Sequence, residues 1–204
     1  DDQKELIKRM IAKDTTDDEL AVFIEYCSRT GLDPFARQIY AIKRWDSREK
    51  RDVLTIQTGI DGLRVTAERT GQYDGQDPPQ WCGEDGVWRE AWLSTAPPVA
   101  ARVAVYRRGI KRAFIGIATY RAYVQTNQEK RPMARWASDP SGMLSKCAEA
   151  QAFRRGFPNE TAGLVVRETA AADAPDSEPH DPTFWRTRYF ETVADTELAT
   201  KEGR

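Results

Sequence analysis

Lysine and arginine are concentrated at two places where the sequence predicts β-hairpin turns. The first is the run Lys43-Arg44-Trp45-Asp46-Ser47-Arg48-Glu49-Lys50-Arg51, and the second is Arg107-Arg108-Gly109-Ile110-Lys111-Arg112. Side chains at a hairpin tip point outward, so each turn is able to contact several phosphates of a nucleic acid. The alternative is that these cations protect sheet edges from aggregation.

A third basic group lies on a helix that the sequence predicts over residues 142–155. Lys146 and Arg154 are eight residues apart and share a helical face with Ala150, whose small side chain permits close approach. A helix that begins at Gly142 also presents free backbone N–H groups, which suit a phosphate. With three basic groups, nucleic-acid binding becomes a serious alternative to edge protection.

The six tryptophans add flat surfaces on which bases can stack. Trp45 in the first basic hairpin and Trp136 before the helix are the best placed for stacking. We expect Trp81, Trp88 and Trp92 to pack within the fold instead.

The net charge of −1 conceals a segregation of charge along the chain. Residues 26–167 carry 23 Lys and Arg against 15 Asp and Glu, whereas residues 1–25 and 168–204 carry net charges of −4 and −5. A basic middle between acidic ends is typical of a phosphate-binding surface, although sums of this size also arise by chance.

The sequence offers little material for catalysis. The one histidine, His180, lies in a predicted linker, and neither a phosphate-binding loop of the GxxxxGKS/T type nor a GxSxG or GxGxxG motif occurs. Asp74 and Asp77 could contribute to a metal-dependent nuclease, but turn chemistry explains them better. We therefore expect no catalytic residue and no metal site, and keep a nuclease and a protein-interaction scaffold as alternatives.

The pattern of apolar residues predicts an α+β fold, in which antiparallel hairpins and a small sheet pack with helices. A capping box, Thr16 with Glu19, predicts a helix that ends at Gly31. The other predicted elements are helices over 4–12, 60–69 and 142–155, strands over 38–45, 53–58, 102–106 and 113–120, and a hairpin over 81–92.

Composition divides the chain into one folded domain and a C-terminal tail. Residues 1–168 form the domain, 169–182 read as a flexible acidic linker without apolar residues to bury, and 183–204 predict a short aromatic helix. Three cysteines without a CxxC pair and the absence of a long apolar run predict a cytoplasmic protein with no membrane segment.

Several motifs resemble phage single-strand annealing proteins of the RecT/Redβ (Bet) family. Gly31-Leu32-Asp33-Pro34-Phe35 with the strand 38–41 resembles the family's opening motif, and Gln57-Thr58-Gly59-Ile60-Asp61-Gly62-Leu63 resembles its GxDG helix start. Tyr73-Asp74-Gly75 and the segment from Trp136 to Phe157 resemble the later elements, in the same order. The resemblance covers about residues 13–167.

The resemblance implies an ATP-independent recombinase that coats single-stranded DNA as a ring or helical filament and anneals a complementary strand. It places the DNA in a basic groove that holds the backbone. It implies no cofactor beyond Mg²⁺ that modulates DNA binding. The implied partners are single-stranded DNA, annealed duplex, further copies of the chain, a phage exonuclease and the host single-strand-binding protein, in the cytoplasm of a bacterial host.

The DNA contacts carried over by position share a positive charge, and they are Lys13, Arg37, Lys43, Arg44, Arg107, Arg108, Lys146 and Arg154. Lys111 and Arg112 join them on charge alone, and Trp136 joins them as an aromatic side chain. Ser141 and Gly142 stand where family members often have Lys or Arg, so fewer contacts are expected at the helix start. Asp61 and Gly62 are expected to set a turn and cap a helix.

Overall fold

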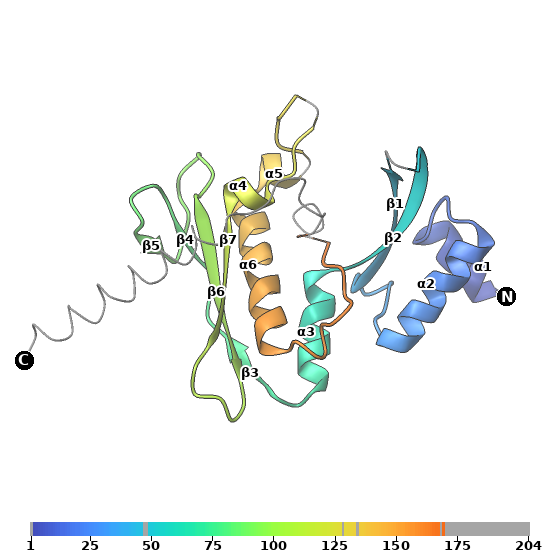
Figure 1. Ribbon diagram of the computed structural model, residues 1–204, viewed down its shortest axis with the longest axis horizontal. Coiled ribbons are helices and arrows are strands. Elements are labelled where there is room, and N and C mark those ends of the chain that lie inside the picture. Colours follow the sequence, from blue (N-terminus) through green and yellow to red (C-terminus); the bar gives the residue numbers. More distant parts are fainter. Residues whose placement is uncertain (1, 47–48, 128, 134, 168, 170–204) are drawn as a thin grey trace, which may run out of the picture. The chain divides into compact units, whose positions relative to one another are not determined.

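The computed structural model describes residues 2–46, 49–127, 129–133, 135–167 and 169 (Figure 1). Helices and antiparallel sheets alternate along this range, which confirms the predicted α+β class. Apart from Thr169, the predicted linker and aromatic tail lie outside the described residues. Within the described ranges, no helix combines the length and the apolar character needed to cross a bilayer.

Two helices, α1 (Asp2–Met10) and α2 (Asp17–Thr30), begin the chain. The predicted capping box is present: the Glu19 N–H donates to Thr16 Oγ1 at 3.2 Å, and the Thr16 N–H donates to Glu19 Oε2 at 2.7 Å. Gly31 ends α2 with φ of 66°, a left-handed conformation that glycine adopts without a steric penalty. Local sequence therefore determines both ends of α2.

The predicted first hairpin consists of β1 (Ile39–Asp46) and β2 (Arg51–Thr58), paired antiparallel from Ile39–Thr58 to Asp46–Arg51. Its two faces have different neighbours, because side chains alternate along a strand. Ile39, Ala41 and Ile56 pack in a cluster with Leu20 and Phe23 of α2. The opposite face carries Tyr40, Ile42 and Arg44.

The second sheet has β6 (Ala100–Arg107) at its centre. On one side β6 pairs with β7 (Phe114–Thr119), and on the other with β3 (Tyr73–Gln76) and β4 (Gln80–Cys82), while β5 (Trp88–Arg89) extends the sheet beside β4. The sequence did not predict β3, because its four residues Tyr-Asp-Gly-Gln show no apolar alternation. Pairing with β6 makes this segment a strand.

One face of this sheet is covered by α6 (Pro140–Gly156), the predicted basic helix, which begins two residues earlier than expected. Figure 1 shows α6 against β6 and β7, with α3 (Ile60–Arg69) on the side away from the sheet. Two one-turn helices, α4 (Tyr120–Tyr123) and α5 (Arg135–Ser138), were not predicted. The core between the layers includes Leu63, Val103, Val105, Leu144, Phe153 and Phe157.

A charged pair ties α3 to α6. Arg64 donates to both carboxylate oxygens of Glu149, at 2.7 and 2.9 Å, and the Glu149 side chain is only 6% exposed. The hydrogen bond to Glu149 is the main reason that the pKa of Arg64 lies above its ordinary value, and Asp61 adds a smaller effect in the same direction. This pair sets the position of α6 relative to α3.

Gly116 on β7 lets the α6 backbone approach the sheet. A Cβ at this position would overlap the Ala148 carbonyl oxygen and lie 2.5 Å from the Ala152 nitrogen, so main chain would have to move. We expect Gly116→Ala to destabilise the protein by about 2–3 kcal/mol, as overpacking of a filled core does. Urea denaturation measures the effect, with Ile117→Ala on the exposed face of β7 as control. Equal midpoints for the two variants would contradict the close packing.

Candidate nucleic-acid interface

A groove of about 490 Å³ lies beside the Tyr40 face of the first hairpin. Its other walls come from the start of α3, from α5 and the loop before it, from the first half of α6 and from Arg167 after α6. Five of its lining side chains are cationic, and Asp61 is the one carboxylate among the described lining residues. The cations are Arg37, Arg44, Arg135, Lys146 and Arg167. Because Arg64 binds Asp61 at 2.9 Å, the groove is strongly positive.

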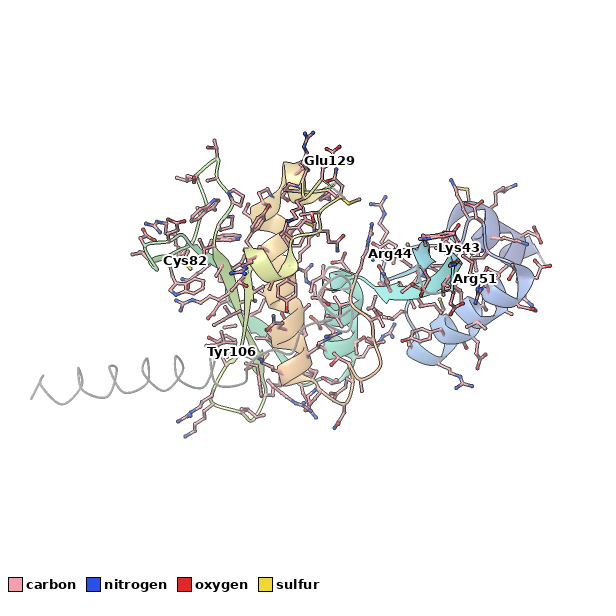
Figure 2. All side chains as sticks on the ribbon, turned by 45° about the horizontal axis from the view of Figure 1, so that its top comes forward. Lys43, Arg44, Arg51, Cys82, Tyr106 and Glu129 are labelled. Carbon is pink, nitrogen blue, oxygen red and sulfur yellow. The ribbon has the colours of Figure 1, made fainter. Side chains whose placement is uncertain are left out.

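Lys43 and Arg44 were both predicted to contact DNA, and they lie on opposite faces of the hairpin (Figure 2). Arg44 lines the groove, whereas Lys43 Nζ lies 3.0 Å from the Glu19 carboxylate of the capping box. The hydrogen bond from the Thr16 N–H is the main cause that holds the pKa of Glu19 below its usual value, and Lys43 adds a smaller effect in the same direction. Lys43 therefore fastens the hairpin to α2, and the structure does not bring it into the groove.

Arg37 reaches the groove from a tight loop in which its φ is 60°. Two of the motifs quoted above meet there: the Gly59 N–H donates to the Gln38 carbonyl at 3.0 Å, and Gly62 faces the same carbonyl too closely to allow a Cβ. Gly59, with no side-chain hydrogen bond, is the N-cap of α3. The prediction that Asp61 and Gly62 cap a helix is thus wrong, because α3 begins before them and Gly62 serves close packing.

Two groove cations, Arg135 and Arg167, escaped the sequence analysis. After α6 the chain returns to β2, where Val166 forms a parallel bridge with Thr58 and the Arg167 N–H donates to the Thr58 carbonyl at 2.9 Å. This pairing places the Arg167 guanidinium 4.4 Å from the centre of the Tyr40 ring. No local pattern signals such a long-range bridge, although Arg135 was visible as the neighbour of Trp136.

Trp136 lines the groove but is only 2% exposed, so the expectation that it offers an open stacking surface is wrong. Its ring packs edge-on against Tyr120, with centroids 5.9 Å apart. The indole N–H has no hydrogen-bond partner among the described residues. Trp45, by contrast, is 65% exposed on the hairpin, and its stacking on a base stays a prediction.

The predicted packing of Trp81, Trp88 and Trp92 is confirmed. The Trp81 N–H donates to the Ser141 carbonyl at 2.9 Å and the Trp92 N–H donates to the Ala96 carbonyl at 2.7 Å. The Arg102 guanidinium lies 4.5 Å from the centre of the Trp88 ring.

The start of α6 does not offer the open phosphate seat that the sequence suggested. The Gly142 N–H donates to Asp139 Oδ1 at 2.9 Å, and Pro140 has no N–H. The Asp139 carboxylate, the N-cap of α6, thus already occupies the position that a phosphate would take at the Gly142 N–H.

In the second basic turn, one cation is bound within the fold and three are exposed. Arg107 donates to Gln72 Oε1 at 2.6 Å and to the Gly156 carbonyl at 2.7 Å, and its guanidinium lies 5.0 Å from the centre of the Phe157 ring. Arg108 is 68% exposed, and Lys111 and Arg112 are exposed as well. None of the four lines the groove.

The remaining two predicted contacts lie elsewhere. Arg154 donates to the Leu164 carbonyl at 3.1 Å and so holds the segment that follows α6, while Lys13 is exposed between α1 and α2. The groove therefore gathers Arg37, Arg44, Trp136 and Lys146 from the predicted set and leaves the others outside. Whether those others contact DNA stays a prediction.

The carboxylates on which the nuclease alternative depends are engaged separately. Tyr106 donates to Asp77 Oδ2 at 2.8 Å, and Arg108 lies 3.7 Å from Asp74. In the part of the chain that the structure describes, no three His, Cys, Asp or Glu side chains are grouped to hold a metal ion.

Burial raises the pKa of two cysteine thiols. It raises the pKa of the Cys27 thiol from 9.0 to about 11 and also raises the pKa of Cys82. Two pKa units leave about 100-fold less thiolate at pH 8, so we expect Cys27 to react about 100-fold more slowly in the folded protein than in urea. Mass spectrometry after timed alkylation resolves each cysteine. A Cys27 labelling rate that urea leaves unchanged would contradict the burial.

Comparison with protein families places the chain among phage single-strand annealing proteins of DNA recombination, because the RecT family matches residues 1–182. The protein belongs to the RecT family. The match confirms the resemblance drawn from the motifs. A search of curated proteins finds no match to the chain.

Proposed function

We propose that this protein binds single-stranded DNA by its backbone in the five-cation groove and anneals a complementary strand without hydrolysing a nucleotide. The groove itself carries this proposal, since Arg37, Arg44, Arg135, Lys146 and Arg167 converge on one surface of a RecT-family chain. Arginine and lysine bind phosphate oxygens through charge-assisted hydrogen bonds, which makes the binding independent of base sequence.

The physics of annealing explains why no fuel is needed. Two complementary strands repel each other through their phosphates, and secondary structure hides their bases. A protein that neutralises one backbone lowers both obstacles, and base pairing then drives the reaction with about 1.4 kcal/mol per stacked step. We propose that several copies act together, as a ring or filament, so that one strand passes across successive grooves.

Annealing of two complementary dye-labelled oligonucleotides, without nucleoside triphosphate and across a salt series, tests this function. We expect fast annealing that depends on the protein and slows with salt, because the logarithm of affinity falls by about 0.7 per contacted phosphate for each tenfold rise in salt. No acceleration at any salt by a folded sample would refute the proposal and favour the interaction scaffold. Strand cleavage that appears with Mg²⁺ or Mn²⁺ would favour the nuclease.

The cellular partners follow from the same activity. We propose that the protein works in the cytoplasm of a bacterial host beside a phage exonuclease that supplies the single strand, and that Mg²⁺ modulates DNA binding without a dedicated site. The host single-strand-binding protein is the other partner that we propose. Removing residues 170–204 should leave DNA binding intact, and loss of annealing would assign that region to the assembly.

A further inference from the structure

Outside the groove, the β6–β7 tip, residues 108–112, exposes three cations and no carboxylate. Arg108, Lys111 and Arg112 are exposed there within five residues. Their one ion pair among the described residues joins Arg108 to Asp74 at 3.7 Å, with both side chains more than half exposed. Such a pair contributes little and is easily replaced by a phosphate.

The chain presents this tip on a rigid base. The Arg108 N–H donates to the Gln72 carbonyl at 2.8 Å, and the Ile110 N–H donates to the Arg107 carbonyl at 3.1 Å. Gly109 adopts φ of 82°, which the turn requires. Arg107, fixed between Gln72 and the end of α6, anchors the turn from below. The backbone of the turn therefore needs little ordering when the three exposed cations bind.

The tip and the groove lie at opposite ends of α6. Lys146 lines the groove, whereas Arg107 binds Gly156 ten residues later, which corresponds to about 15 Å along the helix. Figure 1 shows α5 beside the beginning of α6 and the β6–β7 turn beyond its end. A phosphate in the groove therefore does not reach the tip cations.

The chemistry of the two surfaces also differs. The groove combines charge with the Tyr40 ring, whereas the tip has no aromatic side chain and offers charge alone beside Ile110, which is 46% exposed. A surface without a stacking platform holds a strand by its phosphates and leaves the bases free. The attraction between the exposed tip cations and phosphates is weak and sensitive to salt, so a bound strand dissociates quickly.

We infer that the β6–β7 tip is a second phosphate-binding surface, which contacts the backbone of the incoming complementary strand while the groove holds the first. This inference rests on the proposed annealing function and adds a division of labour to it. The tip lowers the repulsion that the arriving strand meets, and it releases that strand readily because it does not grip the bases.

The test compares three variants of the full chain. The tip variant is Arg108→Gln/Lys111→Gln/Arg112→Gln, and the groove variant is Arg44→Gln/Lys146→Gln. The charge-matched control, Lys4→Gln/Arg9→Gln/Arg29→Gln, removes three exposed cations from α1 and α2. Anisotropy measures affinity for a dye-labelled oligo(dT), stopped-flow fluorescence measures annealing to a preloaded strand, and thermal melts verify folding.

We expect the tip variant to keep its oligo(dT) affinity within about twofold but to anneal about tenfold more slowly at low salt. The slope of log annealing rate against log salt should be shallower by about 2, because three phosphate contacts are lost. Arg108→Lys/Arg112→Lys should anneal normally, since charge suffices, and the control should resemble the unmodified protein. Unchanged annealing by the tip variant overturns the inference. Loss of oligo(dT) affinity equal to that of the groove variant also overturns it, because the tip would then belong to the first-strand site. If the unmodified protein itself fails to anneal, the proposed function falls and this inference with it.

Discussion

Replacing both Arg44 and Lys146 with glutamine should lower the affinity for single-stranded DNA about 100-fold at low salt. The two side chains reach the groove from different elements, β1 and α6, and line it together. A hydrogen bond to a charged group is worth about 1.5 kcal/mol or more. Each lost contact therefore weakens binding about tenfold.

Salt titration identifies the mechanism of that loss. The slope of log affinity against log salt should become shallower by about 1.4, for two lost phosphate contacts. The loss should be the same for oligonucleotides of different sequence, because backbone contacts carry no base information. Lys4→Gln/Arg29→Gln, with the same change in charge on α1 and α2, is the matched control. An unchanged slope in the groove variant, or an equal loss in the control, would show that the groove does not hold the DNA.

Replacing Arg64 with methionine should destabilise the fold by about 3 kcal/mol, the lower end of the range for a broken buried pair. The reason is the partner left behind: the Glu149 side chain is 6% exposed and would keep a charge in the core between α3 and α6. The effect lies at the lower end because the Arg64 side chain is itself 43% exposed. Urea denaturation monitored by circular dichroism measures it.

A double variant separates this charge effect from lost packing. Arg64→Met/Glu149→Leu removes both charges and keeps apolar volume, so we expect it to recover most of the lost stability. Arg121→Met, an exposed arginine on α4, is the matched control and should change stability by less than about 0.5 kcal/mol. A double variant less stable than Arg64→Met would contradict this explanation, since the pair would then stabilise the fold through its packing and not through its charges.

Adjacent basic residues have different roles in both basic turns. In the first hairpin Lys43 pairs with Glu19 while Arg44 lines the groove, and in the second Arg107 binds Gly156 while Arg108 is exposed. Alternation along a strand separates the first pair. Substituting whole basic clusters would therefore mix a loss of stability with a loss of binding.

The sequence by itself determined the local elements. Thr16 and Glu19 set the start of α2 and Gly31 its end, because capping depends on residues within one turn. The first hairpin and the helix over 60–69 followed from the apolar pattern, and the helix predicted over 142–155 followed from Asp139-Pro140 before it and Gly156 after it. The family motifs identified the class of protein, which the family match confirms over residues 1–182.

Only the tertiary structure decided which cations converge. Arg167 joins the groove through a bridge between Val166 and Thr58, residues more than 100 positions apart, while Arg154 turns to the Leu164 carbonyl. Trp136 is buried by packing on Tyr120, and β3 is a strand because β6 lies beside it. Charge and aromatic character are properties of a residue, but exposure and direction depend on which distant segments pack against it. The sequence therefore predicted a basic surface, and the packing of α6, β1 and the returning chain selected its members.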